Sequence, residues 1–477
     1  METVATDTRR EQRIYIMSRP CARDTCHPVD FLAHGAWRSS PATFRGGACS
    51  DTTARTYQCS AARTSAHGIE WRNPPSSPCS AVPALSAALI NGKVPTLWLI
   101  GDSTMAQTAA EAYCRLHDEL TALDSSGRSA REWRWKQPRW SWATTAADGR
   151  ANRMVKCAEA QVRTVRTIPH VKNVPPPAVS NAASRGDMSV AQHHRNTSTD
   201  TPSRGPSVRL CFVPSGARDR YVAEGRAASR VHGALQRLIE YNLTHAHDLA
   251  LMNTGLHYID RSGTHNQLHM EMVHELIGVV ERHQATCPHV LWRETYAQTF
   301  PTPDGLFTKA IKEAESILSR VVAESSATAA RTILSLATHP AVPERARMWL
   351  NTSCEPLPPA ISKPVVLSNV SAALHRHPGF TVLDMWTPTR SLTEQRVSPH
   401  ASLSEGQRAS THTGRAGMPT SNPHQTPLPE DKLLLYDCTH FCSYIGVSRA
   451  ELDAVAFAAA ARRSLVTTPV GARVPSC

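Results

Sequence analysis

A short apolar segment that ends in a glycine-containing turn constrains the fold of this chain most. Residues 96–100 read Thr-Leu-Trp-Leu-Ile and run directly into Gly101, Asp102 and Ser103. Residues 106–120 follow, and they are rich in helix formers with apolar side chains near helical spacing. A buried strand, a tight turn and a helix in this order predict a βα unit. Ser103 is then expected at the carboxyl end of a strand, where open α/β sheets bind ligands.

The same pattern recurs along the chain. Further short apolar runs lie at 208–213, 247–253, 289–293 and 380–385. Segments of helical character alternate with them, at 84–91, 229–243, 265–283, 308–337, 368–375 and 448–462. Alternating strands and helices predict an α/β fold built on a mostly parallel sheet.

Composition divides the chain into segments of different character. Residues 1–28 are polar and Arg-rich and are expected to be disordered. Residues 29–82 are punctuated by Cys, Gly and Trp, which indicates a minor lobe that needs disulfides or docking for stability. Residues 83–463 are interpreted as the main domain, and residues 464–477 as a tail.

Two low-complexity stretches interrupt the main domain, at about 145–206 and 398–427. Their composition predicts long disordered insertions. A Trp- and Arg-rich block at 131–142 precedes the first of them. This block is interpreted as a twisted strand, and the alternative is a set of aromatic faces that stack on sugar rings.

The charge balance favours anionic partners. The 477 residues include 52 Lys and Arg against 40 Asp and Glu, a formal net charge of +12. The basic residues are scattered, and no zinc-finger, homeodomain or RNA-binding signature occurs, so no nucleic-acid partner is expected. An acidic polysaccharide or an anionic membrane surface suits the same charge.

The cysteines indicate a disulfide framework. Five of the 13 precede Ser103, namely Cys21, Cys26, Cys49, Cys59 and Cys79. The half-sites Cys21-x4-Cys26 and Cys438-x3-Cys442 match no common zinc spacing, so no metal is expected.

The cysteines and four Asn-x-Ser/Thr sequons indicate the cellular compartment. The sequons are at Asn196, Asn242, Asn351 and Asn369. Both features fit a lumenal or secreted protein. The first residues contain no apolar signal region. Two interpretations stay open: a segment missing from the amino terminus, or reduced cysteines in another compartment. Membrane association is expected only if an additional amino-terminal anchor exists.

Three residues supply the parts of a nucleophilic site. A serine hydroxyl becomes nucleophilic when an imidazole takes its proton and a carboxylate orients that imidazole. Ser103, His440 and Asp437 are the candidates for these roles. Asp437 and His440 are three residues apart, which allows them to share one turn. The alternatives are a helix cap or plain turn at Gly-Asp-Ser and a surface turn at Asp-x-x-His.

Acyl chemistry also needs donors to the tetrahedral oxyanion. Ser103, Asn253 and Gly255 are expected to provide them, since Asn253 and Gly255 end a predicted strand. The alternative is a strand-ending turn in which Asn and Gly serve the backbone geometry.

Further polar residues are assigned to the substrate side of the site. Asp102 and His257 belong to this group, with a structural role as the alternative for His257. Arg293 and Glu294 follow an apolar run at the same sheet edge. They are expected either to pair with each other or to hold a polar substrate, and a structural ion pair is favoured.

Several motifs, in order, together resemble the PC-esterase family, the trichome-birefringence-like polysaccharide O-acetyltransferases related to GDSL/SGNH hydrolases. The matching stretches are Gly101-Asp-Ser103, Asn253-Thr-Gly-Leu-His257, Trp292-Arg-Glu-Thr295 with Phe300, and Asp437-Cys-Thr-His440-Phe-Cys442. The amino-terminal lobe is similar in Gly35-Ala-Trp37, Cys49, Cys59, Trp71-Arg72 and Cys79, and Cys114 follows in the next helix.

The resemblance implies a three-layer, SGNH-hydrolase-like (flavodoxin-like) fold with a small disulfide-rich lobe, and it implies a location in the Golgi lumen. It implies an O-acetyltransferase that moves acyl groups from a donor to polysaccharide hydroxyls through an acyl-serine, without a metal or organic cofactor. A carbohydrate esterase with the same triad is the first alternative. A non-catalytic glycan-binding Golgi or cell-surface protein is the alternative from another class. The chain differs from the family in its long insertions and in Thr104 after the serine.

Overall fold

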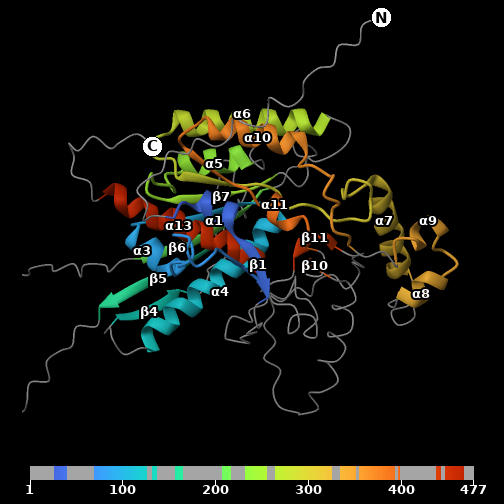
Figure 1. Cartoon of the computed structure of the whole chain (residues 1–477), viewed down its shortest axis with the longest axis horizontal. Coiled ribbons are helices and arrows are strands. Elements are labelled where there is room, and N and C mark those ends of the chain that lie inside the picture. Colours follow the sequence, from blue (N-terminus) through green and yellow to red (C-terminus); the bar gives the residue numbers. More distant parts are fainter. Residues whose placement is uncertain are drawn as a thin grey trace, which may run out of the picture.

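A seven-stranded mixed sheet forms the centre of the chain, with helices on both faces (Figure 1). We describe a computed structural model, and the described residues are 26–39, 69–125, 131–136, 156–164, 207–215, 231–254, 264–324, 333–350, 354–392, 396–397, 437–441 and 446–466. The strands of the sheet are β3 (Thr96–Gly101), β4 (Arg131–Lys136), β5 (Lys156–Thr164), β6 (Ser207–Pro214), β7 (Leu249–Met252), β8 (His289–Arg293) and β9 (Phe380–Leu383).

The strand order places the candidate serine at a topological switch point. In space the order is β4-β5-β6-β3-β7-β8-β9. The strands β6, β3, β7, β8 and β9 are parallel, whereas β4 and β5 are antiparallel additions at one edge. Numbered along the chain, the parallel strands lie in the order 2-1-3-4-5, which is a doubly wound arrangement. The crevice at the carboxyl ends of β3 and β7 is where such sheets bind ligands.

Helices cover each face of the sheet. One layer contains α5 (Val231–Glu240), α6 (Thr264–Arg282) and α10 (Val365–His375), and the other contains α1 (Pro28–His34), α3 (Leu85–Asn91), α4 (Ser103–Ser125) and α13 (Val447–Val466) (Figure 1). Side chains of β3 alternate between the layers: Trp98 packs in the first core and Leu99 in the second. Because β3 is buried on both faces, it reads as a continuous apolar run.

The amino-terminal lobe docks on the second layer. It comprises α1 and the antiparallel pair β1 (Ala36–Ser39) and β2 (Ile69–Arg72). The Cys26–Cys79 disulfide ties it to the segment before α3. The rings of Phe31 and Phe457 are 5.2 Å apart, and Trp37 Nε1 donates to the Pro388 carbonyl at 2.6 Å. The lobe is thereby fixed to α13 and to α11 (Trp386–Thr389), which follows β9.

A smaller helical cluster lies at one end of the molecule, beside the sheet and its helical layers. It contains α7 (Lys309–Glu324), α8 (Ile333–Thr338) and α9 (Glu344–Arg347) (Figure 1). The Cys354–Cys438 disulfide connects it to β11 (Asp437–Phe441), which pairs with β10 (Arg396–Val397). The helical segment expected over 308–337 is therefore α7 and α8.

The structure confirms the predicted strands of the sheet and the helices between them. The prediction of disorder for one insertion is partly wrong. The strand β5 lies inside 145–206, a range expected to be disordered. Its antiparallel pairing with β6, with Cys157 bonded to Cys211 across the strands, makes this segment part of the sheet. The Trp/Arg block forms β4 over its first half, as predicted. The predictions for 1–25, most of 145–206 and 398–427 concern residues outside the described ranges, and so does the prediction for the tail after Val466, where α13 ends.

Disulfides are present as predicted. Seven of the eight described cysteines are bonded, in the pairs Cys26–Cys79, Cys157–Cys211 and Cys354–Cys438 and at Cys114. Cys287 is buried and free, and burial raises the pKa of its thiol to about 12. Such bonding fits an oxidising compartment. Within the described ranges, no helix combines the length and apolar character needed to cross a membrane.

Candidate functional site

The Gly101-Asp102-Ser103 turn lies where three parallel strands end. The Ser215 N–H donates to the Gly101 carbonyl at 2.8 Å, and the Asn253 N–H donates to the Ile100 carbonyl at 3.0 Å. A Cβ on Gly101 would lie 2.6 Å from the Asn253 carbonyl oxygen. Glycine is needed here because the ends of β3 and β7 approach too closely for a side chain.

Asp102 caps the helix that carries the candidate nucleophile. Its Oδ1 accepts from the Thr104 N–H at 2.9 Å and from the Thr104 hydroxyl at 2.6 Å. This is the Asp cap that we considered as the alternative for Gly-Asp-Ser. Ser103 is half-buried at the first helical position, where the helix dipole favours negative charge. The buried Asp102 Oδ2 accepts no hydrogen bond from the described residues, and a role in substrate binding stays a prediction.

Asn253 lies beside this turn at the end of β7. Its side chain is buried, and its Nδ2 donates to the Arg293 carbonyl at 3.0 Å and approaches Thr295 Oγ1 at 3.4 Å. The longer contact leaves one amide hydrogen only weakly bound. Gly255 and His257 lie outside the described residues, so only Asn253 of this segment can be placed.

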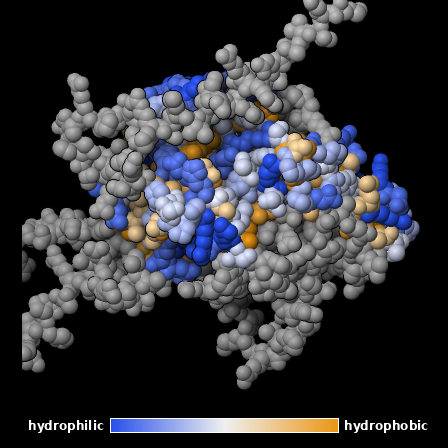
Figure 2. All heavy atoms as spheres, in the orientation of Figure 1, coloured by the Kyte–Doolittle hydropathy of each residue, from blue (hydrophilic) through white to orange (hydrophobic). Residues whose placement is uncertain are grey.

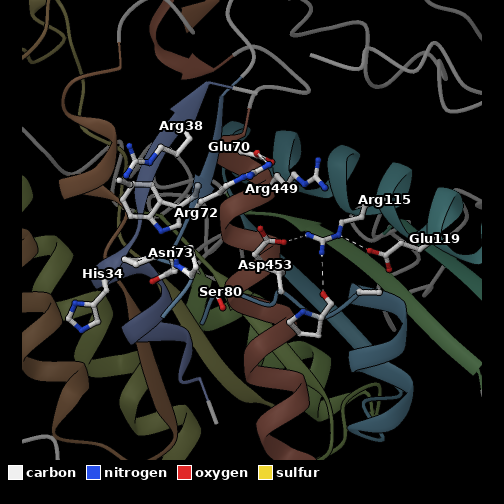
Figure 3. Close-up of a pocket in the computed structure, with 17 residues that line it drawn as sticks. His34, Arg38, Glu70, Arg72, Asn73, Ser80, Arg115, Glu119, Arg449 and Asp453 are labelled. Atoms are coloured by element: carbon white, nitrogen blue, oxygen red, sulfur yellow. Dashed lines mark hydrogen bonds and ion pairs between the residues drawn. The ribbon is translucent and has the colours of Figure 1, made fainter. Parts of the chain in front are cut away.

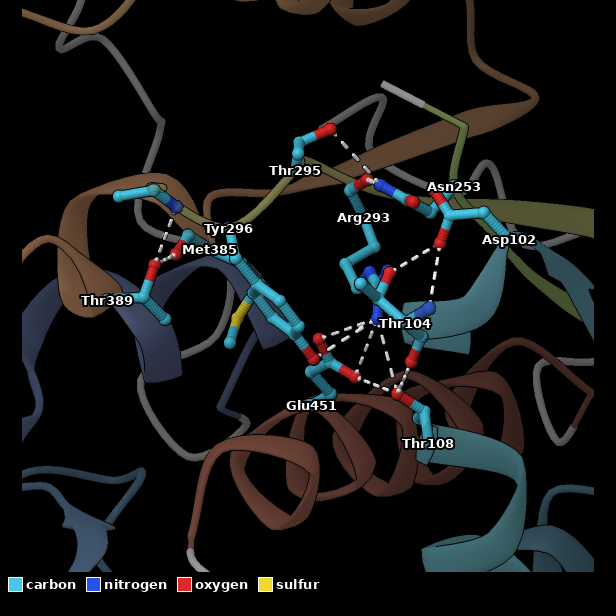
Figure 4. A network of polar contacts seen from close by, with 11 residues as sticks. Asp102, Thr104, Thr108, Asn253, Arg293, Thr295, Tyr296, Met385, Thr389 and Glu451 are labelled. Atoms are coloured by element: carbon cyan, nitrogen blue, oxygen red, sulfur yellow. Dashed lines mark hydrogen bonds and ion pairs between the residues drawn. The ribbon is translucent and has the colours of Figure 1, made fainter. Parts of the chain in front are cut away.

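Arg293 connects the sheet to two helices. It is fully buried, and its Nη1 lies 3.2 Å from Glu451 on α13, 3.2 Å from Thr108 on α4 and 3.1 Å from the Tyr296 hydroxyl. Its Nη2 donates to the Thr104 hydroxyl. Figure 4 shows the guanidinium between the carboxylate of Glu451 and the first turn of α4. The buried network of Arg293 and Glu451 thus stabilises the first turn of α4, which begins at Ser103.

The charges in this network favour an ion pair. Burial by itself lowers the pKa of Arg293, but Glu451 beside it raises that pKa overall, so the guanidinium stays charged. Burial raises the pKa of Glu451, and Arg293 opposes this shift. The expected pairing of Arg293 with Glu294 is wrong. Neighbouring residues at a strand end point to opposite faces of the sheet, so the two side chains enter different helical layers.

Glu294 instead forms a second polar cluster on the α10 side. Lys363 Nζ lies 2.5 Å from its carboxylate, and the Ser371 hydroxyl donates to the other oxygen. Lys363 also lies 3.3 Å from Asp384, which follows β9. Burial, assisted by Asp384, raises the pKa of Glu294 to about 7. This cluster was not predicted from the sequence. The available signal was Asp384, which follows an apolar strand as Asp102 does.

The strand β11 brings the second half of the proposed triad to the helix start. Phe441, next to His440, accepts a hydrogen bond from Gln107 Nε2 at 2.5 Å, and its ring lies 5.1 Å from that of Tyr296. Gln107 is one helical turn after Ser103. The backbone beside His440 therefore runs past the amino-terminal end of α4. The side chains of Asp437 and His440 lie outside the described part of the structure.

The local backbone of β11 differs from the single turn expected for Asp437 and His440. Asp437 pairs with Val397 and Phe441 with the adjacent Arg396, so three residues bulge between them. The Cys354–Cys438 disulfide and the bond from the Thr299 N–H to the Cys438 carbonyl hold this segment extended. In a regular strand residues three apart face opposite sides, and the bulge removes that constraint.

Metal chemistry finds no support among the described residues. They contain no group of three or more His, Cys, Asp or Glu side chains that could hold a metal ion. Cys438, half of one possible zinc pair, is bonded to Cys354.

Comparisons with known proteins give no assignment. No family model matches the sequence, and no curated protein matches it significantly. The function is therefore inferred from the motifs and from the geometry around Ser103.

Proposed function

We propose that the chain is a serine-dependent O-acyltransferase of the PC-esterase type, which acetylates hydroxyls of a polysaccharide in a lumenal or extracellular compartment. One observation supports this most directly. The hydrogen bond from Gln107 to Phe441 joins residues 334 positions apart in the sequence. It brings the backbone that carries His440 next to the helix turn that carries Ser103, as a Ser-His-Asp site requires.

The proposed reaction has two halves. The Ser103 hydroxyl attacks the carbonyl carbon of an acyl donor while His440, oriented by Asp437, takes the hydroxyl proton. The tetrahedral intermediate collapses, the leaving group receives that proton, and an acyl-serine remains. A sugar hydroxyl then attacks the acyl-serine and gives its proton to His440. Collapse of the second intermediate releases the sugar ester, and Ser103 recovers its proton from His440.

The surroundings of Ser103 support acyl chemistry. The dipole of α4 offers positive charge to a developing oxyanion, and the Asn253 and Gly255 amides are the further donors that we predict. Arg293 acts behind the nucleophile, because its contact with Thr104 holds the first turn of α4. The same residues catalyse hydrolysis if water replaces the sugar hydroxyl, and an esterase is therefore the alternative outcome.

A fluorophosphonate probe tests the proposal. We expect the folded protein to be labelled, and Ser103→Ala to lose labelling completely because no acyl-accepting oxygen remains. The matched control is Ser86→Ala, which removes a buried serine on α3 and should be labelled like the wild type. Incubation with an acetyl donor and a panel of glycans, read by mass spectrometry, separates transfer from hydrolysis.

Two results would contradict the proposal. Labelling of Ser103→Ala at the wild-type rate would place the nucleophile elsewhere. Absence of labelling in folded wild-type protein, with glycan binding retained, would favour the non-catalytic alternative.

A further inference from the structure

A cavity lies between part of the amino-terminal lobe and the helices behind it. It has a volume of about 1010 Å³ and lies between β1, β2, α4 and α13 (Figure 3). A cavity of this size accommodates an oligosaccharide-sized ligand. Arg115 lines it 12 residues after Ser103 on α4, which corresponds to about 18 Å along the helix. The cavity is therefore distinct from the candidate acyl site.

Arginine side chains dominate the charge of the cavity. Four of them line it, together with three carboxylates. Arg115 is held by Glu119 at 2.8 Å and by Asp453 at 2.6 Å, so two of the carboxylates are already paired. The third, Glu70, pairs with Arg72.

The two remaining arginines are available to a ligand. Arg38 on β1 and Arg449 on α13 are both exposed. Neither forms an ion pair with any carboxylate in the described ranges. The charge of Arg449 nevertheless acts to lower the pKa of Asp453. Figure 3 shows Arg38 and Arg72 on the hairpin and Arg449 on the facing helix, and all three line the cavity. Planar guanidinium groups bind carboxylates and sulfates with two parallel hydrogen bonds.

The cavity wall also contains an acceptor without a donor. Asn73 is 8% exposed, and its Nδ2 donates to the Phe31 carbonyl at 2.9 Å. Its Oδ1 is buried and receives no hydrogen bond from the described residues. Because a water-sized group does not reach this oxygen, Asn73 contributes to the wall of the cavity and not to ligand binding. Ser80, which also lines the cavity, offers a hydroxyl of its own.

We propose that this cavity binds an acidic oligosaccharide. The ligand must carry anionic groups for Arg38 and Arg449 and polar groups for the Ser80 hydroxyl, and an acidic sugar chain carries both. Carboxylated and sulfated sugars share this chemistry. The site takes no part in the acyl reaction. It provides a second contact for a glycan chain, about 18 Å along α4 from Ser103.

The proposal is tested by isothermal titration calorimetry of the full chain with tetragalacturonate and with a sulfated tetrasaccharide. We expect Arg38→Gln/Arg449→Gln to weaken binding of at least one of them by tenfold or more. The control, Arg282→Gln/Arg376→Gln, removes the same charge from exposed positions on α6 and after α10, and should stay within twofold of wild type. An uncharged tetrasaccharide should bind at least tenfold more weakly.

The outcomes separate this site from the acyl site. Ser103→Ala should bind the acidic sugar like the wild type, and Arg38→Gln/Arg449→Gln should keep wild-type fluorophosphonate labelling. Equal weakening by both arginine pairs would show general charge attraction and overturn the proposal. Absence of binding to either anionic sugar would overturn it as well.

Discussion

Glu294 is a buried carboxylate whose proton affinity depends on the fold. It is 2% exposed, and burial raises its pKa from 4.5 to about 7. The folded state therefore binds this proton more tightly than the unfolded state does. The resulting stabilisation is fully present below pH 4.5 and is lost as the pH rises through 7.

This predicts a pH dependence that one substitution removes. Between pH 5 and pH 8 the free energy of unfolding of the wild type should fall, relative to Glu294→Gln, by about 3 kcal/mol. Urea denaturation of both proteins across this range measures the difference. A constant difference between them would mean that Glu294 does not take up a proton on folding.

At the scale of elements, one buried ion pair joins β8 to α13, and hydrogen bonds from the same guanidinium to Thr104 and Thr108 reach α4. Arg293 and Glu451 both have 0% exposed side chains. Glu451→Gln should lower the free energy of unfolding by about 3–5 kcal/mol, because a buried guanidinium loses its counter-charge. Arg293→Met/Glu451→Met should lose less than Glu451→Gln does, since it leaves no buried charge.

The control for this prediction is an exposed pair. Lys309 and Glu313 on α7 have side chains 90% and 50% exposed, at 3.7 Å. Glu313→Gln should change the free energy of unfolding by less than about 0.5 kcal/mol. Urea unfolding gives all of these values. If the double substitution proved worse than Glu451→Gln, packing rather than charge would explain the loss.

At the scale of the whole molecule, two disulfides close loops of nearly equal length. Cys26–Cys79 spans 53 residues and Cys157–Cys211 spans 54, yet one fixes the amino-terminal lobe and the other joins two strands. The chain-entropy account assigns each about 4 kcal/mol. Cys26→Ser/Cys79→Ser and Cys157→Ser/Cys211→Ser should therefore lower the free energy of unfolding by similar amounts.

Chemical denaturation without reductant measures both losses. Cys287→Ala is the control, because it removes a free buried thiol and should cost only about 1 kcal/mol for the small cavity. Losses that differ by more than twofold between the two disulfide variants would show that the lobe contributes to stability differently from the sheet.

Features set by neighbouring residues could be predicted from the sequence, whereas features set by distant contacts could not. Ser103 and Asn253 could be placed at strand ends because apolar runs and turn residues act within a few positions. The strand β5 was missed because its segment is polar and is held by pairing with β6. The bulge in β11 was missed because a distant disulfide and the loop after β8 hold it extended.

The sequence by itself determined the βα units, the α/β class, the disulfide-rich character and the location of Ser103 after a buried strand. These depend on periodicity and on short-range turn chemistry. The tertiary structure alone decided that Arg293 pairs with Glu451, that Glu294 turns to Lys363, and that four arginines surround one cavity. Those contacts join distant segments, and only the winding of the chain around the sheet brings them together.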